Sequence, residues 1–359
     1  MIAPIKDETF INPFLRSGAI ANISKDKLVI GWGKAQKKSA RDLDRALPAF
    51  YFSDFFLTKD KPWIQYADWM EIAMGELERY LKPEPHEYVD DWTYPESQSF
   101  HQTFDELMDL LHEGRLQKGV PYVFMHSKQH MTQARLLLSL RGGLDALMQR
   151  KAYLYGHWDE ESGVLGVTPE LLFTHNEMDP FQVETMALAG TASLSQNERE
   201  FFLNEKERLE HRWVIEGILE RVKGEGTATI GEMQVLRLRN LAHLMTPISI
   251  ELKRRFDFEA LVDCLHPTPA LGAFPMEEGK KWLLHLQKRQ PRNYYGAPIG
   301  IQSGKDGISN CYVGIRNVQW DSEGLHVGAG CGVVKQSEFN REWQEIQLKL
   351  GAIRNQLNL

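Results

Sequence analysis

Segments typical of β-strands occur in blocks along this chain, and long amphipathic helices separate the blocks. Several short apolar segments with strand character follow one another between residues 152 and 195. Helical periodicity, with apolar residues three or four positions apart, marks residues 99–113, 196–223 and 340–356. Blocks of strands interrupted by long helices favour α+β layers over the regular alternation of a βαβ winding. The pattern therefore predicts an α+β fold.

Shorter elements complete this expectation. Residues 69–81 have a helical periodicity that ends before a proline, and residues 82–97 are rich in proline and charge, which is typical of a connector. Two further helices are expected at residues 258–265 and 277–287. Strands are expected at residues 27–33, 120–125, 233–238, 297–301, 311–318 and 324–330.

The chain has 359 residues, of which 42% are hydrophobic and 25% charged, an ordinary composition for a globular protein with a large core. Its formal net charge of -7 gives no basic character that would favour a nucleic-acid partner. No run approaches 18 uncharged apolar residues, and the first ten residues lack a signal-peptide pattern, so we expect no membrane span and no secretion. Three cysteines without a CxxC spacing fit a reduced, cytoplasmic protein.

A small-residue turn followed by an amphipathic helix is the strongest chemical signal, and it lies near the C-terminus. Glu342, Glu345 and Lys349 stand at positions i, i+3 and i+7, so they share one face of that helix. A second pair with the same spacing, Glu207 and Glu210, lies on an upstream helix. Each pair alone is typical of a solvated helix face, because glutamate is a common helix former. Together they raise the hypothesis of an all-carboxylate site for a hard cation, Mg²⁺ rather than Zn²⁺.

Two charged residues stand in apolar surroundings. Glu170 follows Pro169 after a strand-like segment, so it is either a general acid with a raised pKa or a turn glutamate in solvent. Arg316 lies in the expected apolar strand at 311–318 and needs a partner there. That partner is either a carboxylate ligand bound in bidentate fashion or a structural salt bridge.

Two short segments could shape a pocket. Residues 188–191, Leu-Ala-Gly-Thr, offer backbone N–H groups to an anion, and residues 265–270, Leu-His-Pro-Thr-Pro-Ala, form a stiff loop or a simple helix terminator. The sequence has no GxxxxGK[ST], HExxH or GxSxG motif, and no GxGxxG after a strand. Nucleotide-driven chemistry, zinc hydrolysis and serine hydrolysis are therefore unsupported.

Eight of these segments, in this order, resemble the signatures of the chorismate-utilising enzymes. They span roughly residues 114–350 and read GRLQK, GVTPELLF, LAGTA, KERLEHRWV, HPTPALGAFP, RNYYGAPIG, VGIRNV and AGCGVVKQSEFNREWQEIQLKL. The family includes isochorismate synthases, salicylate synthases, anthranilate synthase component I and aminodeoxychorismate synthase component I. The resemblance implies two facing antiparallel β-sheets with helices packed outside and an active site between the sheets. It also implies a variable N-terminal part of the same fold at residues 1–100 and a chorismate-binding catalytic region at residues 101–359.

The resemblance also implies a role for each matching residue. For Mg²⁺, which would hold the ring carboxylate of chorismate, the implied direct ligands are Glu210 and Glu345, and the outer carboxylates, acting mostly through water, are Glu207 and Glu342. Glu170 matches the general acid that protonates the departing C4 hydroxyl. The positions that match residues around the substrate are Gly190, Thr191, His243, Ala270, Tyr295, Arg316, Gly330, Gly332 and Lys349. Among them, Arg316 and Tyr295 match residues that bind the enolpyruvyl carboxylate, and Lys349 neighbours the metal-bound carboxylate.

The residue that activates water in isochorismate and salicylate synthases is a lysine, and Lys118 stands where it belongs. The usual family text is G-x-x-x-K-V-V-L-[SA]-R, whereas this chain reads GRLQKGVPYV, with Pro121 and Val123 in place of the leucine and the arginine. Lys128 is a competing candidate that requires a gap, and a surface lysine at the start of a strand is the alternative without a catalytic role. A lysine that acts as a base must be neutral, so its pKa must be lowered.

The expected reaction is the conversion of chorismate to isochorismate, by addition of water at C2 and loss of the C4 hydroxyl. Ala270 favours this product, because salicylate synthases tend to have threonine there. A salicylate synthase, an ammonia-using component I enzyme and a non-catalytic chorismate-binding homologue remain alternatives. We expect the product to serve menaquinone or siderophore biosynthesis, with a slight preference for menaquinone. We expect no obligatory protein partner.

Overall fold

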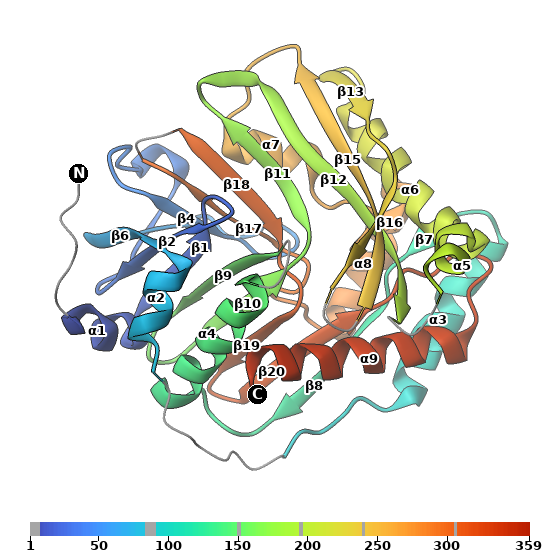
Figure 1. The fold of residues 1–359 in the computed structure, drawn as a ribbon. Helices are drawn as coiled ribbons and strands as arrows, with labels where there is room; N and C mark the ends of the chain where they lie inside the picture. The colour runs from blue at the N-terminus through green and yellow to red at the C-terminus, as the bar shows by residue number, and fades with distance from the viewer. Residues whose placement is uncertain (1–7, 83–90, 149–151, 194–196, 239–240, 305–306) are drawn as a thin grey trace.

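The computed structural model describes residues 8–82, 91–148, 152–193, 197–238, 241–304 and 307–359. Half of the expected connector, residues 83–90, lies outside these ranges. In the described part of the chain, two large sheets face each other, and the paired strands within each sheet are antiparallel (Figure 1). Helices pack on the outer faces of both sheets. The predicted α+β fold with two facing antiparallel sheets is therefore confirmed.

The first sheet combines strands from both ends of the chain. Its order is β6 (Asp68–Ala73), β2 (Lys27–Trp32), β1 (Gly18–Asn22), β9 (Tyr153–Trp158), β10 (Gly163–Thr168), β19 (Asn317–Asp321), β20 (Gly324–Gly330) and β8 (Tyr122–Ser127). The last two strands of this sheet, β20 and β8, pair in a regular register in which Gly330 lies opposite Tyr122.

The second sheet contains the two longest strands, β12 and β15. Its order is β13 (Gly226–Ile230), β15 (Leu241–Leu252), β12 (Asp179–Ser193), β11 (Leu171–Asn176), β18 (Ile308–Val313), β17 (Pro298–Gln302), β4 (Ala49–Phe52), β5 (Trp63–Gln65) and β3 (Gln36–Lys38), with β14 (Gln234–Arg237) on β15. A separate short pair joins β7 (Lys118–Gly119) to β16 (Ala273–Phe274). Strands from the first hundred residues therefore enter both large sheets.

The outer helices cover the sheets in two groups. On the first sheet lie α1 (Ile11–Arg16), α2 (Met74–Tyr80), α4 (Gln133–Met148) and α9 (Phe339–Leu357). On or beside the second sheet and the short pair lie α5 (Glu198–Leu203), α6 (Glu205–Val222), α7 (Phe258–Leu265) and α8 (Met276–Arg289), and α3 (Ser97–His112) contacts α9. Short 3₁₀ turns occur at Glu8–Phe10 and Ala40–Asp42. None of the helices in the described ranges combines the length and the apolar run needed to cross a membrane.

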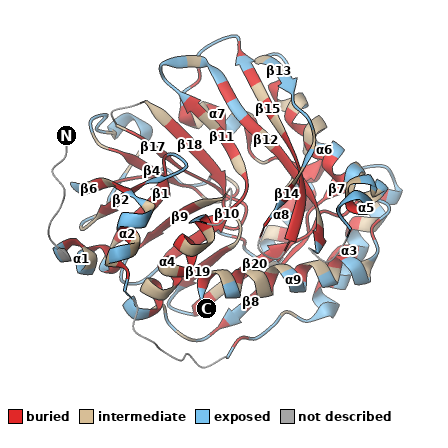
Figure 2. Ribbon diagram, viewed as in Figure 1, coloured by how far each residue is buried: buried red, intermediate tan, exposed pale blue. Residues whose placement is uncertain are grey.

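The space between the sheets is filled by apolar side chains from both of them. Ala21 and Val164 of the first sheet belong to the same buried cluster as Phe50, Ile299 and Tyr312 of the second. Figure 2 shows the resulting pattern, in which strands are largely buried and the outer helix faces are exposed. Burial of apolar surface between the sheets fixes their spacing.

Several predicted elements agree with the structure, and others are wrong for identifiable reasons. The helix at 258–265 and the strand at 324–330 are confirmed as α7 and β20. Residues 69–81 are not one helix: they form β6 and then α2, because Met70 and Ile72 alternate toward the interior while the strand pairs with β2. The expected helix at 196–223, whose first residue is not described, is divided into α5 and α6 at Asn204. The Asn204 side chain accepts a hydrogen bond from the Glu207 N–H and so caps α6.

The expected strand at 311–318 is also interrupted. The chain leaves the second sheet at the end of β18, Val313, and enters the first sheet at Asn317, the start of β19. Arg316 lies in this crossover with φ of 55°, a left-handed conformation that is uncommon for residues other than glycine. The prediction that Arg316 stands within an apolar strand is therefore wrong, and the crossover places it between the sheets.

Candidate active site

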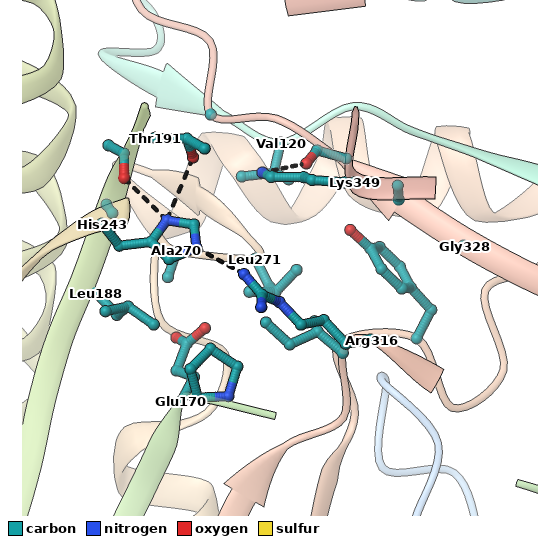
Figure 3. A pocket seen from close by; sticks show the side chains of 18 of the residues that line it. Val120, Glu170, Leu188, Thr191, His243, Ala270, Leu271, Arg316, Gly328 and Lys349 are labelled. Atoms are coloured by element: carbon teal, nitrogen blue, oxygen red, sulfur yellow. Dashed lines mark hydrogen bonds between the residues drawn. The ribbon is translucent and has the colours of Figure 1, made fainter. Parts of the chain in front are cut away.

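A pocket lies where elements of both sheets approach helices α6 and α9. Figure 3 shows Glu170, His243, Arg316 and Lys349 arranged around it. It is lined by the predicted acid Glu170, by the predicted metal ligand Glu210 and by all nine residues predicted to surround the substrate: Gly190, Thr191, His243, Ala270, Tyr295, Arg316, Gly330, Gly332 and Lys349. Four other predicted site residues do not line this pocket. Lys118 contacts Glu210, which does line it, and a neighbouring groove is lined by Glu207, Glu342 and Glu345.

Arg316 is held in the pocket by a chain of hydrogen bonds (Figure 3). Its Nη2 atom donates to His243 Nε2 at 2.7 Å, so the hydrogen of the imidazole is on Nδ1. His243 Nδ1 then donates to the Gly190 carbonyl oxygen at 3.0 Å. Burial, together with the charge of Arg316, lowers the pKa of His243 well below its usual value. A neutral His243 orients the guanidinium group without neutralising its charge.

Tyr295 lines the same pocket as Arg316, and a buried arginine holds its backbone. Arg292 Nε donates to the Tyr295 carbonyl oxygen at 2.9 Å, and Arg292 Nη2 donates to the Leu271 carbonyl oxygen at 3.1 Å. The guanidinium group also lies 3.6 Å from the centre of the Phe55 ring. Arg292 therefore links Tyr295 to the loop that carries Ala270. The sequence offered one signal for this role, an arginine shortly before a predicted strand.

Glu170 is buried in the turn between β10 and β11, with 3% of its surface exposed. Its N–H donates to Thr168 Oγ1 at 3.2 Å, which helps to fix the turn. Burial raises the pKa of Glu170 to about 8, although Lys118, Lys349 and Arg316 oppose this shift. The alternative of a turn glutamate in solvent is excluded, and the carboxyl group is largely protonated at neutral pH.

Lys118 is completely buried in β7, where it lies opposite Phe274 of β16. Its Nζ donates to the Pro269 carbonyl oxygen at 2.8 Å and lies 3.5 Å from Glu210 Oε1. Burial lowers the pKa of Lys118, and the neighbouring carboxylates only partly offset this effect. The alternative of a surface lysine is excluded. The competing Lys128 is exposed just after β8 and lies outside the pocket.

Gly332 lets the turn after β20 approach these groups closely. A Cβ atom at this position would lie 2.0 Å from Glu210 Oε1 and 2.8 Å from Lys118 Cε. No side chain fits such a gap without displacing the carboxylate, so the site requires glycine here.

The four glutamates form a cluster between α6 and α9, and a lysine stands at its centre. Lys206 Nζ lies 3.3 Å from Glu207 Oε1, 3.2 Å from Glu210 Oε2 and 3.0 Å from Glu342 Oε1. Glu345 is paired instead with Lys349, at 2.6 Å. Lys206 was not among the predicted site residues. Its position four residues before Glu210 on one helix was the available signal.

Burial and charge act against each other on these carboxylates. Burial would raise the pKa of Glu210, but Lys206, Lys118 and Lys349 lower it to about 2. Burial raises the pKa of Glu207 to about 7 and also raises that of Glu342. Glu207 is held in place because its Oε2 accepts a hydrogen bond from the Thr191 N–H at 2.8 Å. Glu210 is therefore the most strongly anionic of these three groups.

The donor set fits a hard cation such as Mg²⁺. It consists of carboxylate oxygens, and Glu342 Oε2 is buried without a hydrogen-bond partner among the described residues. Within those residues, however, no three acidic, histidine or cysteine groups already converge closely enough to hold a metal ion. Three of the carboxylates instead lie within 3.3 Å of the Lys206 ammonium group.

Comparison with known proteins gives the same family as the sequence motifs. A family model described as chorismate binding enzyme matches residues 52–358. Isochorismate synthase MenF from Haemophilus influenzae is 29% identical over 206 residues, which cover 55% of this chain and 46% of that protein. Isochorismate synthase MenF from Bacillus subtilis is 29% identical over 212 residues, which cover 56% of this chain and 44% of that protein. The chain thus spans less than half the length of these curated relatives.

Solved structures show the same fold in two branches of the family. MenF, the menaquinone-specific isochorismate synthase from Escherichia coli, has a TM-score of 0.76 at 20% identity, covering 99% of this chain and 92% of its own. Anthranilate synthase component I from Streptococcus pneumoniae has a TM-score of 0.71 at 15% identity, covering 91% of this chain and 92% of its own. At these identities the structures establish the fold alone. Because the family model extends from residue 52 to residue 358, the chain belongs to the chorismate-binding enzyme family.

Proposed function

We propose that this protein is an Mg²⁺-dependent isochorismate synthase. The observation that carries the proposal is the pair of buried groups beside the pocket, Lys118 with a lowered pKa and Glu170 with a raised pKa. A base must be neutral to take a proton, and an acid must be protonated to give one. Burial moves both groups toward the form that the reaction needs.

In the proposed reaction, Lys118 takes a proton from water as the water oxygen forms a bond to C2 of chorismate. The ring double bonds shift, and the bond between C4 and its hydroxyl oxygen breaks. Glu170 protonates the leaving hydroxyl, so one water molecule enters and one leaves. Arg316 and Tyr295 would hold the enolpyruvyl carboxylate, with His243 orienting the guanidinium group. Fixed charges of this kind stabilise the transition state without reorganisation.

The four carboxylates of α6 and α9 would hold Mg²⁺. When bound, the ion supplies positive charge for the ring carboxylate of chorismate. The buried Oε2 atom of Glu342, which has no hydrogen-bond partner among the described residues, supports the presence of a cation in this cluster. Glu210 and Glu345 are the proposed direct ligands, and Glu207 and Glu342 the proposed outer ones.

The names of the relatives support isochorismate as the product. The proposal places that product in menaquinone rather than siderophore biosynthesis, and the similarity to a MenF described as menaquinone-specific supports this choice. The proposal includes a cytoplasmic location and activity without an obligatory protein partner. Incubation of the purified protein with chorismate and Mg²⁺ tests the product, and we expect isochorismate alone. Salicylate with pyruvate would indicate a salicylate synthase, turnover only with ammonia would indicate the amination branch, and binding without turnover a non-catalytic homologue.

Replacement of Lys118 tests the base. We expect Lys118→Ala to lower kcat by about 100-fold or more, the range found when a general base is lost. Lys128→Ala is the matched control, because this exposed lysine lies outside the pocket, and it should keep full activity. Steady-state rates of isochorismate formation measure both variants. Full activity of Lys118→Ala would contradict the assignment, whatever the product.

A further inference from the structure

The ammonium group at the centre of the carboxylate cluster has a second consequence. Lys206 contacts Glu207 and Glu210 on its own helix and Glu342 on α9, with all three N···O distances between 3.0 and 3.3 Å. One charged side chain therefore joins the two helices that the proposed metal ion would join. A cation and a metal ion cannot both occupy the centre of the same carboxylate cluster.

The cluster needs a cation even when no metal is bound. The side chains of Glu207, Glu210 and Glu342 have only 13%, 7% and 2% of their surface exposed, and that of Lys206 has 16%. Buried carboxylates so close together repel one another unless a positive charge compensates them. Lys206 supplies that charge from within the chain.

We propose that Lys206 is the resident counter-ion of the metal-free protein and that Mg²⁺ binds by displacing its ammonium group. This inference rests on the proposed Mg²⁺ site and adds that metal binding is an exchange of one cation for another. Because the lysine already stabilises the carboxylates, the net free energy of Mg²⁺ binding is only the difference between the carboxylate–Mg²⁺ and the carboxylate–lysine interactions. Lys206 therefore weakens metal binding while it stabilises the metal-free fold.

The surroundings of Lys206 leave room for this exchange. A groove separate from the substrate pocket has Lys206, Glu207, Glu342 and Glu345 among its lining residues. Thr191 lines both the groove and the pocket, and its N–H holds Glu207, so it forms part of the wall between them. A lysine has a flexible four-carbon stem, so the ammonium group can turn into the groove while its backbone stays in α6.

Lys206→Met removes the charge and keeps most of the side-chain volume. We expect isothermal titration calorimetry without chorismate to give a Kd for Mg²⁺ about tenfold lower in this variant than in the wild-type protein. In EDTA the variant should have a lower Tm, and Mg²⁺ should raise that Tm more than in the wild type. Arg212→Met is the matched control, because Arg212 is exposed on the same helix and pairs with Glu216 outside the cluster. An unchanged or higher Kd in Lys206→Met would overturn the proposal.

A measurement on the wild-type protein keeps the test independent of how the variant folds. Lysine acylation followed by mass spectrometry should label Lys206 several times faster with Mg²⁺ than in EDTA, because the displaced ammonium group reaches solvent. The exposed Lys223 at the end of α6 should react equally in both conditions. Labelling of Lys206 that stays the same or slows with Mg²⁺ would overturn the exchange.

These outcomes separate the inference from the proposed function. If the wild-type protein binds Mg²⁺ and forms isochorismate, but either the Kd or the labelling does not change as expected, the exchange fails and the function stands. If the wild-type protein forms isochorismate without binding Mg²⁺, the metal site and the exchange both fail. If it binds Mg²⁺ by exchange but does not form isochorismate, the inference stands and the proposed reaction fails.

Discussion

Glu170 and Lys118 are both buried, yet burial moves their pKa values in opposite directions. Water stabilises the charged form of each group, and loss of water therefore favours the neutral form of both. The neutral form of a glutamate carries a proton, and the neutral form of a lysine lacks one. The same physical effect thus produces an acid at Glu170 and favours a base at Lys118.

The raised pKa of Glu170 predicts that the rate of the proposed reaction depends on pH. The pKa of Glu170 is raised to about 8, so its protonated form is lost as the pH rises through that value. We expect kcat/KM for chorismate to fall about tenfold for each pH unit above about 8, as a single required proton is lost. Initial rates at constant Mg²⁺ across this range measure the effect. A rate that stays level to well above pH 8 would contradict the role of Glu170 as the acid.

The residues of the site could be predicted from the sequence where they belong to short sequence motifs. Glu170, Glu210 and Arg316 belong to such motifs, and the structure brings them to one pocket. Lys206 was missed because its role depends on α6 facing α9, which no local pattern specifies. The burial of Lys118 was equally hidden, because it depends on pairing with Phe274, far away in the sequence.

At the scale of elements, α9 shows how one helix serves both the core and the site. Ile346, Leu350 and Ile353 are buried within the main hydrophobic cluster, while Glu345 and Lys349 form an ion pair beside the pocket. The apolar residues anchor the helix, and the charged residues depend on that anchor for their position.

A substitution in the buried face of α9 should therefore lower stability. Leu350→Ala removes a side chain with no exposed surface, and we expect it to lower the free energy of unfolding by about 2–5 kcal/mol. Leu348→Ala on the same helix is the control, because Leu348 is 53% exposed, and it should change the value by about 0.5 kcal/mol or less. Urea denaturation measures both. Equal losses in the two variants would refute the assignment of the buried face.

Elements with a simple apolar period were the predictable ones, as α7 illustrates. Helix α4 was not predicted: Gly142 and Gly143 interrupt its helical pattern, and a Cβ atom at Gly142 would lie 2.6 Å from the Gln356 carbonyl oxygen of α9. Those glycines are explained by tertiary packing. The break between β18 and β19 also reflects the whole fold, since the chain changes sheets there.

For the whole molecule, the important feature is that the site joins parts that are distant in the chain. Glu170 follows a strand of the first sheet, Gly190 lies in the second sheet, and Lys349 belongs to the last helix. The family resemblance predicted the facing sheets, but which strands are neighbours, such as β1 beside β9, could not be read from local patterns. Which strands pair with each other is determined by the packing of the complete chain.

Removal of metal tests the site as a unit. We expect EDTA to abolish turnover and excess Mg²⁺ to restore it, because the ring carboxylate of chorismate loses its positive partner. The far-UV circular dichroism should stay the same, since Lys206 still compensates the carboxylates. EDTA already saturated with Mg²⁺ is the control and should leave the rate unchanged. Full activity in protein shown by elemental analysis to be metal-free would exclude the metal requirement.

The arrangement of Lys206 also bears on how the chain is made. During translation, α6 leaves the ribosome well before α9, so Glu207 and Glu210 exist for a time without the helix that completes their cluster. Lys206 emerges with them, on the same helix and four residues from Glu210. The growing polypeptide thus carries a compensating charge for these acids from the moment they appear, whatever the supply of free ions in the surrounding fluid.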